Sequence, residues 1–149
     1  MTTNVQDLTD RAELTDLLTR QGLWLDEQRF DDADTIFTPD ATVETQSGRS
    51  QGLQALAARA RRVHSQFERT QHVISNVLID LDGDEASVRA NLVATFVRDA
   101  TSPEPDLAVG ERYRFGAVRT PAGWRFSSVT VTPVWRTGEP PVATPDSDA

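Results

Sequence analysis

The sequence predicts an α+β fold in which a curved antiparallel sheet wraps around N-terminal helices and forms a cone with an internal pocket. Apolar residues at helical spacing fill most of the first half of the chain, and four long strand patterns joined by polar turns fill the second half. A helix laid across such a sheet leaves one end of the interior open. We expect a flexible N-terminus over residues 1–9, a single domain over 10–136 and a disordered tail over 137–149.

The first predicted helix runs from about Asp10 to Gln28, and Asp7, Thr9 or Asp10 is suited to cap its N-terminus. A short second helix is expected over residues 29–37, and the TPD sequence at 38–40 ends it. One stripe of the first helix follows the three- and four-residue spacing that indicates a buried face. Its members are Leu14, Leu17, Leu18, Gln21 and Leu25.

A short strand over residues 41–45 and a turn over 46–52 precede the third predicted helix, Leu53 to Phe67. His64 lies at the edge of the apolar stripe of this helix, where a solvated or lid position is expected. The sheet follows, with strands predicted over residues 70–81, 86–98, 108–119 and 124–135.

The first long strand carries polar side chains on the face that should be buried. Its sequence is RTQHVISNVLID over residues 69–80, and His72, Asn76 and Asp80 share the parity of Ile74 and Leu78. An imidazole on this face predicts that the face lines a pocket, although a hydrogen-bonded core or edge histidine remains the alternative.

Composition excludes several chemistries. The chain has no cysteine and no lysine, so disulfides, thiolate nucleophiles, cysteine-bound metals and Schiff-base chemistry are absent. The net charge is −8, with eleven acidic residues and three arginines among the first 44 positions, which disfavours binding to nucleic acid or anionic membranes. No signal-peptide pattern and no run of about 18 apolar residues occurs, so a cytoplasmic protein is expected.

The order of several segments resembles that of SnoaL-like domains, which belong to the nuclear-transport-factor-like cone superfamily. These segments, within about residues 10–136, are LWLDEQRFDDADTIFTPDATVE, GLQAL, RTQHVISNVLIDLDGDEA, GERYRFGAVRT and GWRF. The local pattern is similar to that of scytalone dehydratase-like and polyketide cyclase-like members. Asp26 matches their aspartate late in the first helix, and His72 matches their histidine early in the first long strand.

Two departures from these members stand out. Leu25 replaces the tyrosine that precedes the aspartate, and GERYRFG holds neither the histidine nor the asparagine that the dehydratases carry on the third strand. Dehydration of a scytalone-type substrate is therefore not implied by the resemblance.

Asp26 and His72 are the predicted catalytic residues. A carboxylate that holds one imidazole nitrogen fixes the tautomer and stabilises the imidazolium, so that the other nitrogen can take or give a proton. Neither a metal nor an organic cofactor is expected, because His64 and His72 have too few companion ligands for a metal site.

Five residues are candidates for binding the substrate, and each has a structural alternative. Asn76 could instead form a hydrogen bond to a loop. Arg112 could pair with an acidic residue on a neighbouring strand, and the same holds for Arg114. Trp24 or Trp135 could lie in a dimer interface. Trp124 is expected in the core. The candidates are Trp24, Asn76, Arg112, Tyr113 and Trp135.

The resemblance implies a cofactor-independent cyclase, dehydratase or isomerase that acts by general acid–base catalysis on an aromatic or polyketide-like molecule. The alternative is a non-catalytic module of the same fold that binds a small molecule or dimerises, and a weaker option is a small subunit beside an oxygenase. A homodimer is expected, because an antiparallel sheet with one uncovered face tends to pair with a copy of itself.

Overall fold

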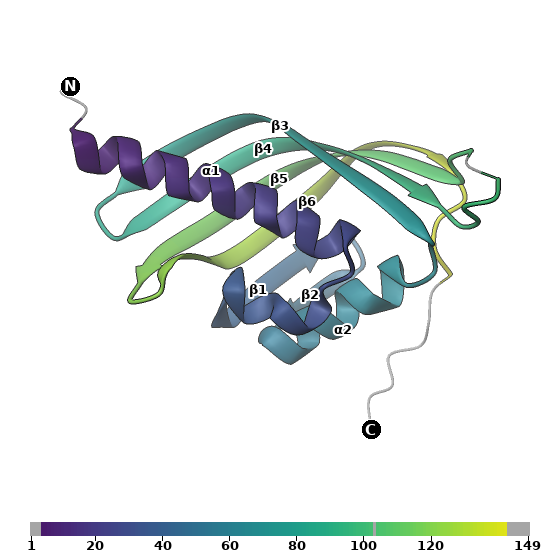
Figure 1. Cartoon of the computed structure of the whole chain (residues 1–149), viewed down its shortest axis with the longest axis horizontal. Helices are drawn as coiled ribbons and strands as arrows, with labels where there is room; N and C mark the ends of the chain where they lie inside the picture. Colours follow the sequence, from purple (N-terminus) through teal and green to yellow (C-terminus); the bar gives the residue numbers. More distant parts are fainter. Residues whose placement is uncertain (1–3, 103, 143–149) are drawn as a thin grey trace.

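The computed structural model describes residues 4–102 and 104–142, and it confirms the predicted α+β class (Figure 1). Two α-helices and one 3₁₀ helix in this part of the chain are α1 (Val5–Asp26), η1 (Phe30–Thr35) and α2 (Leu53–His64). The strands are β1 (Phe37–Thr45), β2 (Gly48–Gln51), β3 (Arg69–Asp82), β4 (Glu85–Val97), β5 (Leu107–Thr120) and β6 (Gly123–Gly138).

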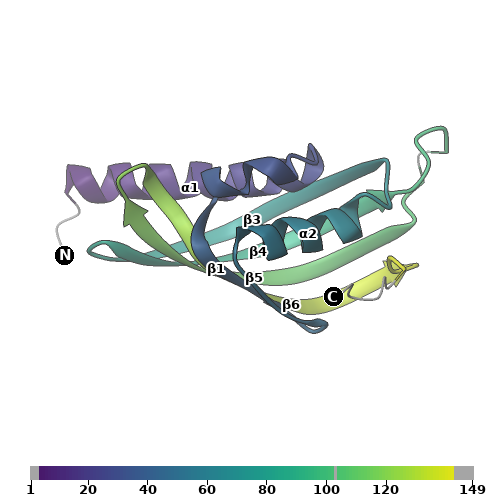
Figure 2. The ribbon, with the colours of Figure 1, turned by 90° about the horizontal axis from the view of Figure 1, so that it is seen from below.

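The described strands form one curved sheet in the order β2-β1-β6-β5-β4-β3, and the helices lie on its concave side (Figure 2). α1 runs along β3, and α2 lies near η1 and β1. Four of the five strand pairs are antiparallel, but β1 runs parallel to β6, with Val43 opposite Val129. The purely antiparallel sheet expected from the sequence is corrected at this one pair, where β1 occupies the edge of β6 that β5 leaves free.

Helix α1 begins earlier than predicted. The Asn4 side chain accepts a hydrogen bond from the Asp7 backbone N–H at 2.8 Å, so Asn4 is the N-cap and the helix starts at Val5 instead of near Asp10. The expectation of a flexible segment up to residue 9 is therefore wrong for residues 5–9, while residues 1–3 lie outside the described residues. No helix in residues 4–102 or 104–142 is long and apolar enough to cross a membrane.

Other boundaries also differ from the predictions, and β1 begins at Phe37 instead of residue 41. The polar stretch expected as a turn contains β2, whose residues pair with β1 across a tight turn. Helix α2 ends at His64 instead of Phe67, and β6 continues to Gly138. Residues 143–149 of the predicted tail lie outside the described residues.

A β-bulge in β3 reverses the side-chain alternation. The pairing of β3 with β4 shifts between Ser75 and Leu78, and Asn76 between them has a φ of 55°. Before the bulge, His72 and Ile74 lie on the concave side; after it, Leu78 is 49% exposed and Ile79 is 8% exposed. The parity predicted from the sequence therefore holds only as far as Ser75.

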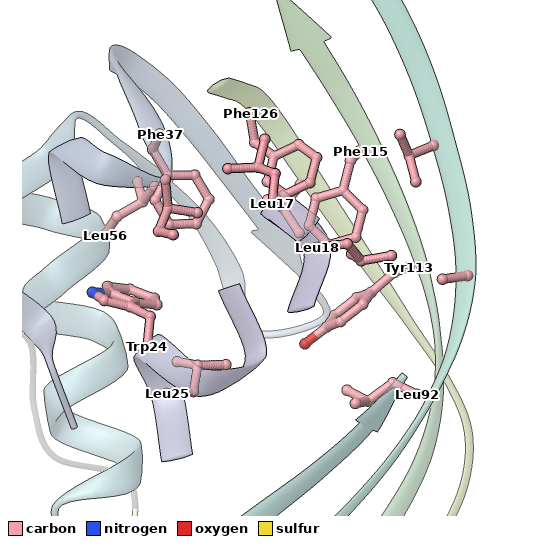
Figure 3. Packing of buried hydrophobic residues seen from close by; sticks show 14 of the residues in the cluster. Leu17, Leu18, Trp24, Leu25, Phe37, Leu56, Leu92, Tyr113, Phe115 and Phe126 are labelled. Carbon is pink, nitrogen blue, oxygen red and sulfur yellow. The ribbon is translucent and has the colours of Figure 1, made fainter. Parts of the chain in front are cut away.

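The core fills the space between the helices and the concave side of the sheet (Figure 3). Leu14 and Leu17 are fully buried, and the rings of Phe115 and Phe126 stack with their centroids 4.3 Å apart. Burying each of these side chains is worth about 1.5–3 kcal/mol. Trp124 is 2% exposed, as expected for a core residue.

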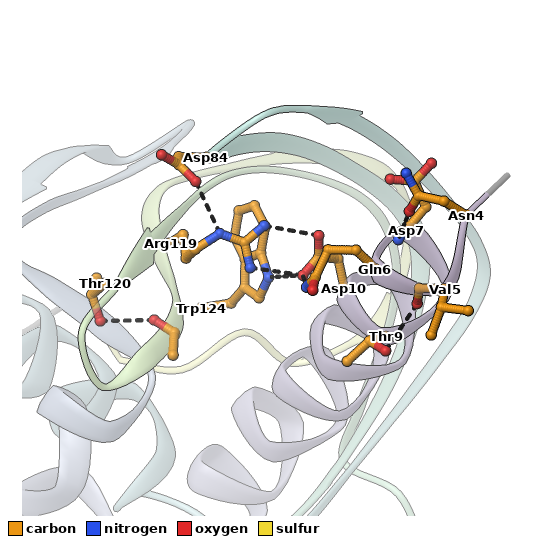
Figure 4. A network of polar contacts seen from close by, with 11 residues as sticks. Asn4, Val5, Gln6, Asp7, Thr9, Asp10, Asp84, Arg119, Thr120 and Trp124 are labelled. Atoms are coloured by element: carbon orange, nitrogen blue, oxygen red, sulfur yellow. Dashed lines mark hydrogen bonds and ion pairs between the residues drawn. The ribbon is translucent and has the colours of Figure 1, made fainter.

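A polar clamp of Asp10, Asp84, Arg119 and Trp124 fixes the N-terminal part of α1 to the sheet (Figure 4). Arg119 donates from Nη1 and Nη2 to the two Asp10 carboxylate oxygens at 2.8 Å each, and Trp124 Nε1 donates to Asp10 at 3.1 Å. Arg119 Nε also donates to Asp84 at 3.0 Å. The Arg119 hydrogen bonds hold the pKa of Asp10 well below its usual value, although burial opposes them.

Candidate active site

Asp26 and His72 meet where the last turn of α1 passes over β3. His72 Nδ1 lies 2.5 Å from Asp26 Oδ1, the His72 backbone N–H donates to Oδ2 at 2.9 Å, and the Thr70 hydroxyl donates to Oδ1 at 2.9 Å. Gly22 permits the close approach, because a Cβ there would lie 3.2 Å from the Ile74 Cδ1 atom. In the neutral form of the ring, the Asp26 carboxylate holds the proton on Nδ1, and Nε2 is then the atom that can accept a proton.

The surroundings keep the Asp26 carboxylate ionised. Burial alone would raise its pKa, but hydrogen bonds from the His72 ring and backbone, the charge on His72 and the Thr70 hydroxyl together lower the pKa below its usual value. The Asp26 side chain is 18% exposed and that of His72 only 3%. A fixed negative charge in this sheltered position stabilises an imidazolium at His72.

His72 opens onto a pocket of about 210 Å³ between the helices and the concave face of the sheet. Most of its wall is apolar, which suits a hydrophobic or aromatic molecule. The apolar lining includes Trp24, Leu25, Phe37, Val43, Leu56, Ala60, Val63, Leu92, Phe96, Val129 and Val131. The other lining residues are Gln21, Thr45, Arg59, His64, His72, Glu111 and Tyr113.

His64 lies beside His72 but has different partners. Its Nδ1 is 2.9 Å from the Ala60 carbonyl oxygen, and its ring centroid is 5.3 Å from that of His72. Burial, together with the charge on His72, lowers the pKa of His64 to about 4, so His64 is neutral at pH 7. The predicted solvated or lid position is wrong, because His64 is 8% exposed.

Glu111 and Tyr113 extend from β5 into the same pocket. Burial raises the pKa of Glu111, while the charge on His72 opposes this. Burial, with the charge of Glu111, also raises the pKa of Tyr113, so that its hydroxyl stays protonated. In Figure 3 the Tyr113 ring extends from the sheet toward the helices, hydroxyl end first.

The sequence pattern of the SnoaL-like domain family matches residues 6–130 of this chain. The chain belongs to the SnoaL-like domain family. This SnoaL-like protein is 32% identical over 128 residues to the uncharacterized protein Rv2910c of Mycobacterium tuberculosis, with 83% of this chain and 84% of that protein covered.

Solved structures share the cone fold of this SnoaL-like protein. The "Putative Scytalone Dehydratase" of Novosphingobium aromaticivorans superposes with a TM-score of 0.80 at 21% identity, over 96% of this chain and 97% of that one. The hexachlorocyclohexane dehydrochlorinase LinA-type3 of Novosphingobium barchaimii superposes with a TM-score of 0.78 at 17% identity, over 95% of each chain. At these identities the likeness establishes the fold alone.

Of the residues predicted from the sequence of this SnoaL-like protein, Asp26 and His72 are brought into contact, and Trp24 and Tyr113 line the pocket beside His72. Trp24 is 5% exposed and packs edge-on against Phe37 at 5.4 Å between ring centroids. These four positions therefore form one connected region around the pocket.

The other three predicted binding residues lie outside this pocket. Asn76 is exposed at the bulge. Arg112 lies opposite Asn91 and Thr132 on the convex face, because Glu111 and Tyr113 take the inward positions of β5. Trp135 is 46% exposed, and a Cβ at Gly110 would lie only 2.0 Å from its Nε1 atom, so its indole covers Gly110 on the convex face.

Sequence reasoning missed Glu111, although a signal for it was available. Glu111 has the same parity as Tyr113 and Phe115, and this alternation predicts that all three point to the concave side. A carboxylate in an otherwise inward row is the kind of exception that marks a pocket. The described residues contain no group of three or more His, Cys, Asp or Glu placed to hold a metal ion.

The convex face of the SnoaL-like sheet carries a line of apolar residues across four strands, which we term the outer row. Val73 lies opposite Val93, Val93 opposite Gly110, and Gly110 opposite Trp135. Val73 is 52% exposed and Val93 is 43% exposed. No described helix covers this face, since the helices lie on the concave side (Figure 2).

Proposed function

We propose that this protein is a cofactor-independent enzyme of the lyase or isomerase type that acts on an aromatic or polyketide-like small molecule. The observation that carries the proposal is the Asp26 carboxylate bound to both the ring and the backbone of His72. This arrangement leaves Nε2 of His72 as the basic atom at an apolar pocket.

In the proposed mechanism, His72 Nε2 removes a proton from a carbon next to a carbonyl group, and Asp26 stabilises the resulting imidazolium. Acid–base help of this kind typically contributes about 10²–10⁴-fold to the rate. Returning the proton to another atom gives isomerisation, losing a leaving group gives elimination, and attack by the carbanion on a second carbonyl gives cyclisation. The names of two structural relatives, a dehydratase and a dehydrochlorinase, fit the elimination branch.

The test uses nitrobenzisoxazole, a flat aromatic probe whose ring opens when a base removes its carbon-bound proton. The wild-type protein should open the ring faster than buffer, His72→Ala should fall to the buffer rate, and Asp26→Asn should lose about 10²-fold or more because the ring is no longer held and its charge is unsupported. Absorbance of the released nitrophenolate measures each rate.

Gln71→Ala is the matched control, since Gln71 neighbours His72 on β3 and is exposed. Its rate should equal that of the wild type. Full turnover by both His72→Ala and Asp26→Asn would contradict the proposed mechanism.

A second candidate function, a pairing module, is favoured by the outer row. Exposed apolar residues in register across a sheet are typical of surfaces that bind another protein. We infer that the outer row pairs two copies of this chain, with or without catalysis in the pocket. A protein that dimerises and binds aromatic molecules but leaves the probe unchanged would support the module alone.

A further inference from the structure

We propose that Glu111 is a second catalytic residue, a general acid that protonates the leaving group while His72 removes the proton. This inference rests on the proposed function and narrows it to elimination of a group, such as hydroxide, that leaves only when protonated. It assigns a role to a side chain that the Asp26–His72 mechanism does not use.

The first argument is position. His72 and Ala94 are opposite each other on β3 and β4, Ala94 is opposite Val109 on β5, and Glu111 is the next inward residue of β5. Neighbouring strands are about 4.8 Å apart, and successive inward residues along one strand are roughly 6.6 Å apart. The backbones of His72 and Glu111 are therefore separated by about the width of a small aromatic molecule together with its van der Waals contacts on both sides. Both side chains line the same pocket, and the charge on His72 acts on the Glu111 carboxyl.

The second argument is that the Glu111 carboxyl has no hydrogen-bond or ion-pair partner in the part of the chain that the structure describes, residues 4–102 and 104–142. Its cross-strand neighbours are Leu92 and Pro133, neither of which can offer a side-chain hydrogen bond. A carboxyl in such surroundings prefers the protonated form, which is the form that an acid catalyst requires.

The third argument is the polar corner, which we define as Gln21, Glu111 and Tyr113. All three side chains line the same pocket, and both Glu111 and Gln21 influence the pKa of the Tyr113 hydroxyl. Gln21 is 4% exposed, and its Oε1 is buried without a hydrogen-bond partner among the described residues. An unused acceptor in a pocket wall indicates a ligand with its own donor, such as a hydroxyl group.

The balanced step is an elimination from a β-hydroxy ketone. His72 Nε2 takes the proton from the carbon next to the carbonyl, and the electron pair of that C–H bond becomes the new C=C bond. The C–O bond at the β-carbon breaks with its pair on oxygen, and this oxygen takes the Glu111 proton and leaves as water. His72 then returns a proton to solvent, and Glu111 regains one.

The test compares two probes that differ in leaving group: an aromatic β-hydroxy ketone and a β-nitrophenoxy ketone, whose phenolate leaves without protonation. Glu111→Gln keeps the size and polarity of the side chain but cannot supply a proton. It should lower kcat for the hydroxy ketone about 10²–10⁴-fold with little change in KM, and leave the nitrophenoxy ketone unaffected. His72→Ala should abolish turnover of both.

Three results would decide otherwise. If Glu111→Gln slowed both probes equally, or neither of them, the proposed role of Glu111 would be overturned. The proposed function would still stand in that case, provided that turnover depended on His72. Turnover of neither probe by the wild-type protein would overturn both proposals. Infrared spectroscopy gives a check independent of turnover: at neutral pH the wild type should show a protonated-carboxyl band that Glu111→Gln lacks.

Discussion

His64 and His72 have ring centroids only 5.3 Å apart, but their Nδ1 atoms contact different groups. The Nδ1 atom of His72 faces the Asp26 carboxylate, and the Nδ1 atom of His64 faces the Ala60 carbonyl oxygen inside the core. Because His64 stays neutral, a proton can be added to His72 without placing two adjacent positive charges in a sheltered site. The pair of rings thus provides one base and one inert neighbour.

At the residue scale, His64 should make stability depend on pH. Its pKa falls from 6.5 to about 4 on folding, so between these values the unfolded chain binds more protons than the folded one. The free energy of unfolding should have its full value above about pH 6.5 and decrease as the pH falls toward 4. For a pKa change of this size, the decrease should be roughly 3 kcal/mol. Urea unfolding at a series of pH values measures this.

His64→Phe keeps a ring of similar size but cannot titrate. The difference in unfolding free energy between the wild type and this variant should change with pH across the same window, since other groups contribute equally to both proteins. Two parallel pH profiles would refute the assignment.

At the element scale, predictions from the sequence succeed where a simple period continues and fail where one residue interrupts it. The helical stripe that places Leu14 and Leu17 in the core is unbroken, and so is the alternation in β4. In β3 the left-handed backbone of Asn76 reverses the pattern, and nothing in the sequence distinguishes this asparagine from one in a regular strand.

Contacts between distant elements explain most of the remaining differences. Periodicity does not reveal which residue of α1 passes over which residue of β3. The Asp26–His72 contact is therefore predicted only by the resemblance to SnoaL-like domains. Trp135 was expected in the pocket, but its side of the sheet depends on a second register shift, next to Gly110. Pairing register is set by long-range packing, which a single sequence does not display.

The polar clamp should stabilise the attachment of α1. Asp10→Asn removes the negative charge to which both Arg119 and Trp124 donate hydrogen bonds. It should lower the free energy of unfolding by about 2 kcal/mol. Urea unfolding followed by tryptophan fluorescence measures the change. Asp16→Asn is the matched control, because Asp16 is exposed on the same helix and the change in charge is identical. Equal stabilities of the two variants would show that the clamp contributes nothing specific.

At the scale of the whole molecule, the sheet separates the proposed active site on one face from exposed apolar residues on the other. The concave face carries the pocket and the candidate active site, and the convex face carries the outer row. Alternating side chains of the same strands supply both, so that Glu111 faces the pocket while its neighbour Arg112 faces outward. Binding on one face therefore leaves the other accessible.

The outer row predicts a homodimer. The wild-type protein should sediment at about twice its chain mass of 16.5 kDa, and Val93→Arg, in the middle of the row, should give the monomer mass. A charge buried in an apolar interface costs several kcal/mol, which exceeds what a pairing of this kind can absorb. Analytical ultracentrifugation reports the masses, and Glu13→Arg on exposed α1 is the control. A wild-type monomer at all concentrations would refute the prediction.

The parallel pairing of β1 with β6 also determines when the protein can finish folding. During synthesis β1 leaves the ribosome early, yet its neighbour in the sheet is the last strand of the domain. Sheets that depend on contacts between residues so distant in sequence fold slowly. Until β6 is available, the backbone hydrogen-bonding groups along one edge of the β1–β2 hairpin have no partner strand. A nascent chain stalled before Gly123 should therefore remain sensitive to protease and dependent on chaperones.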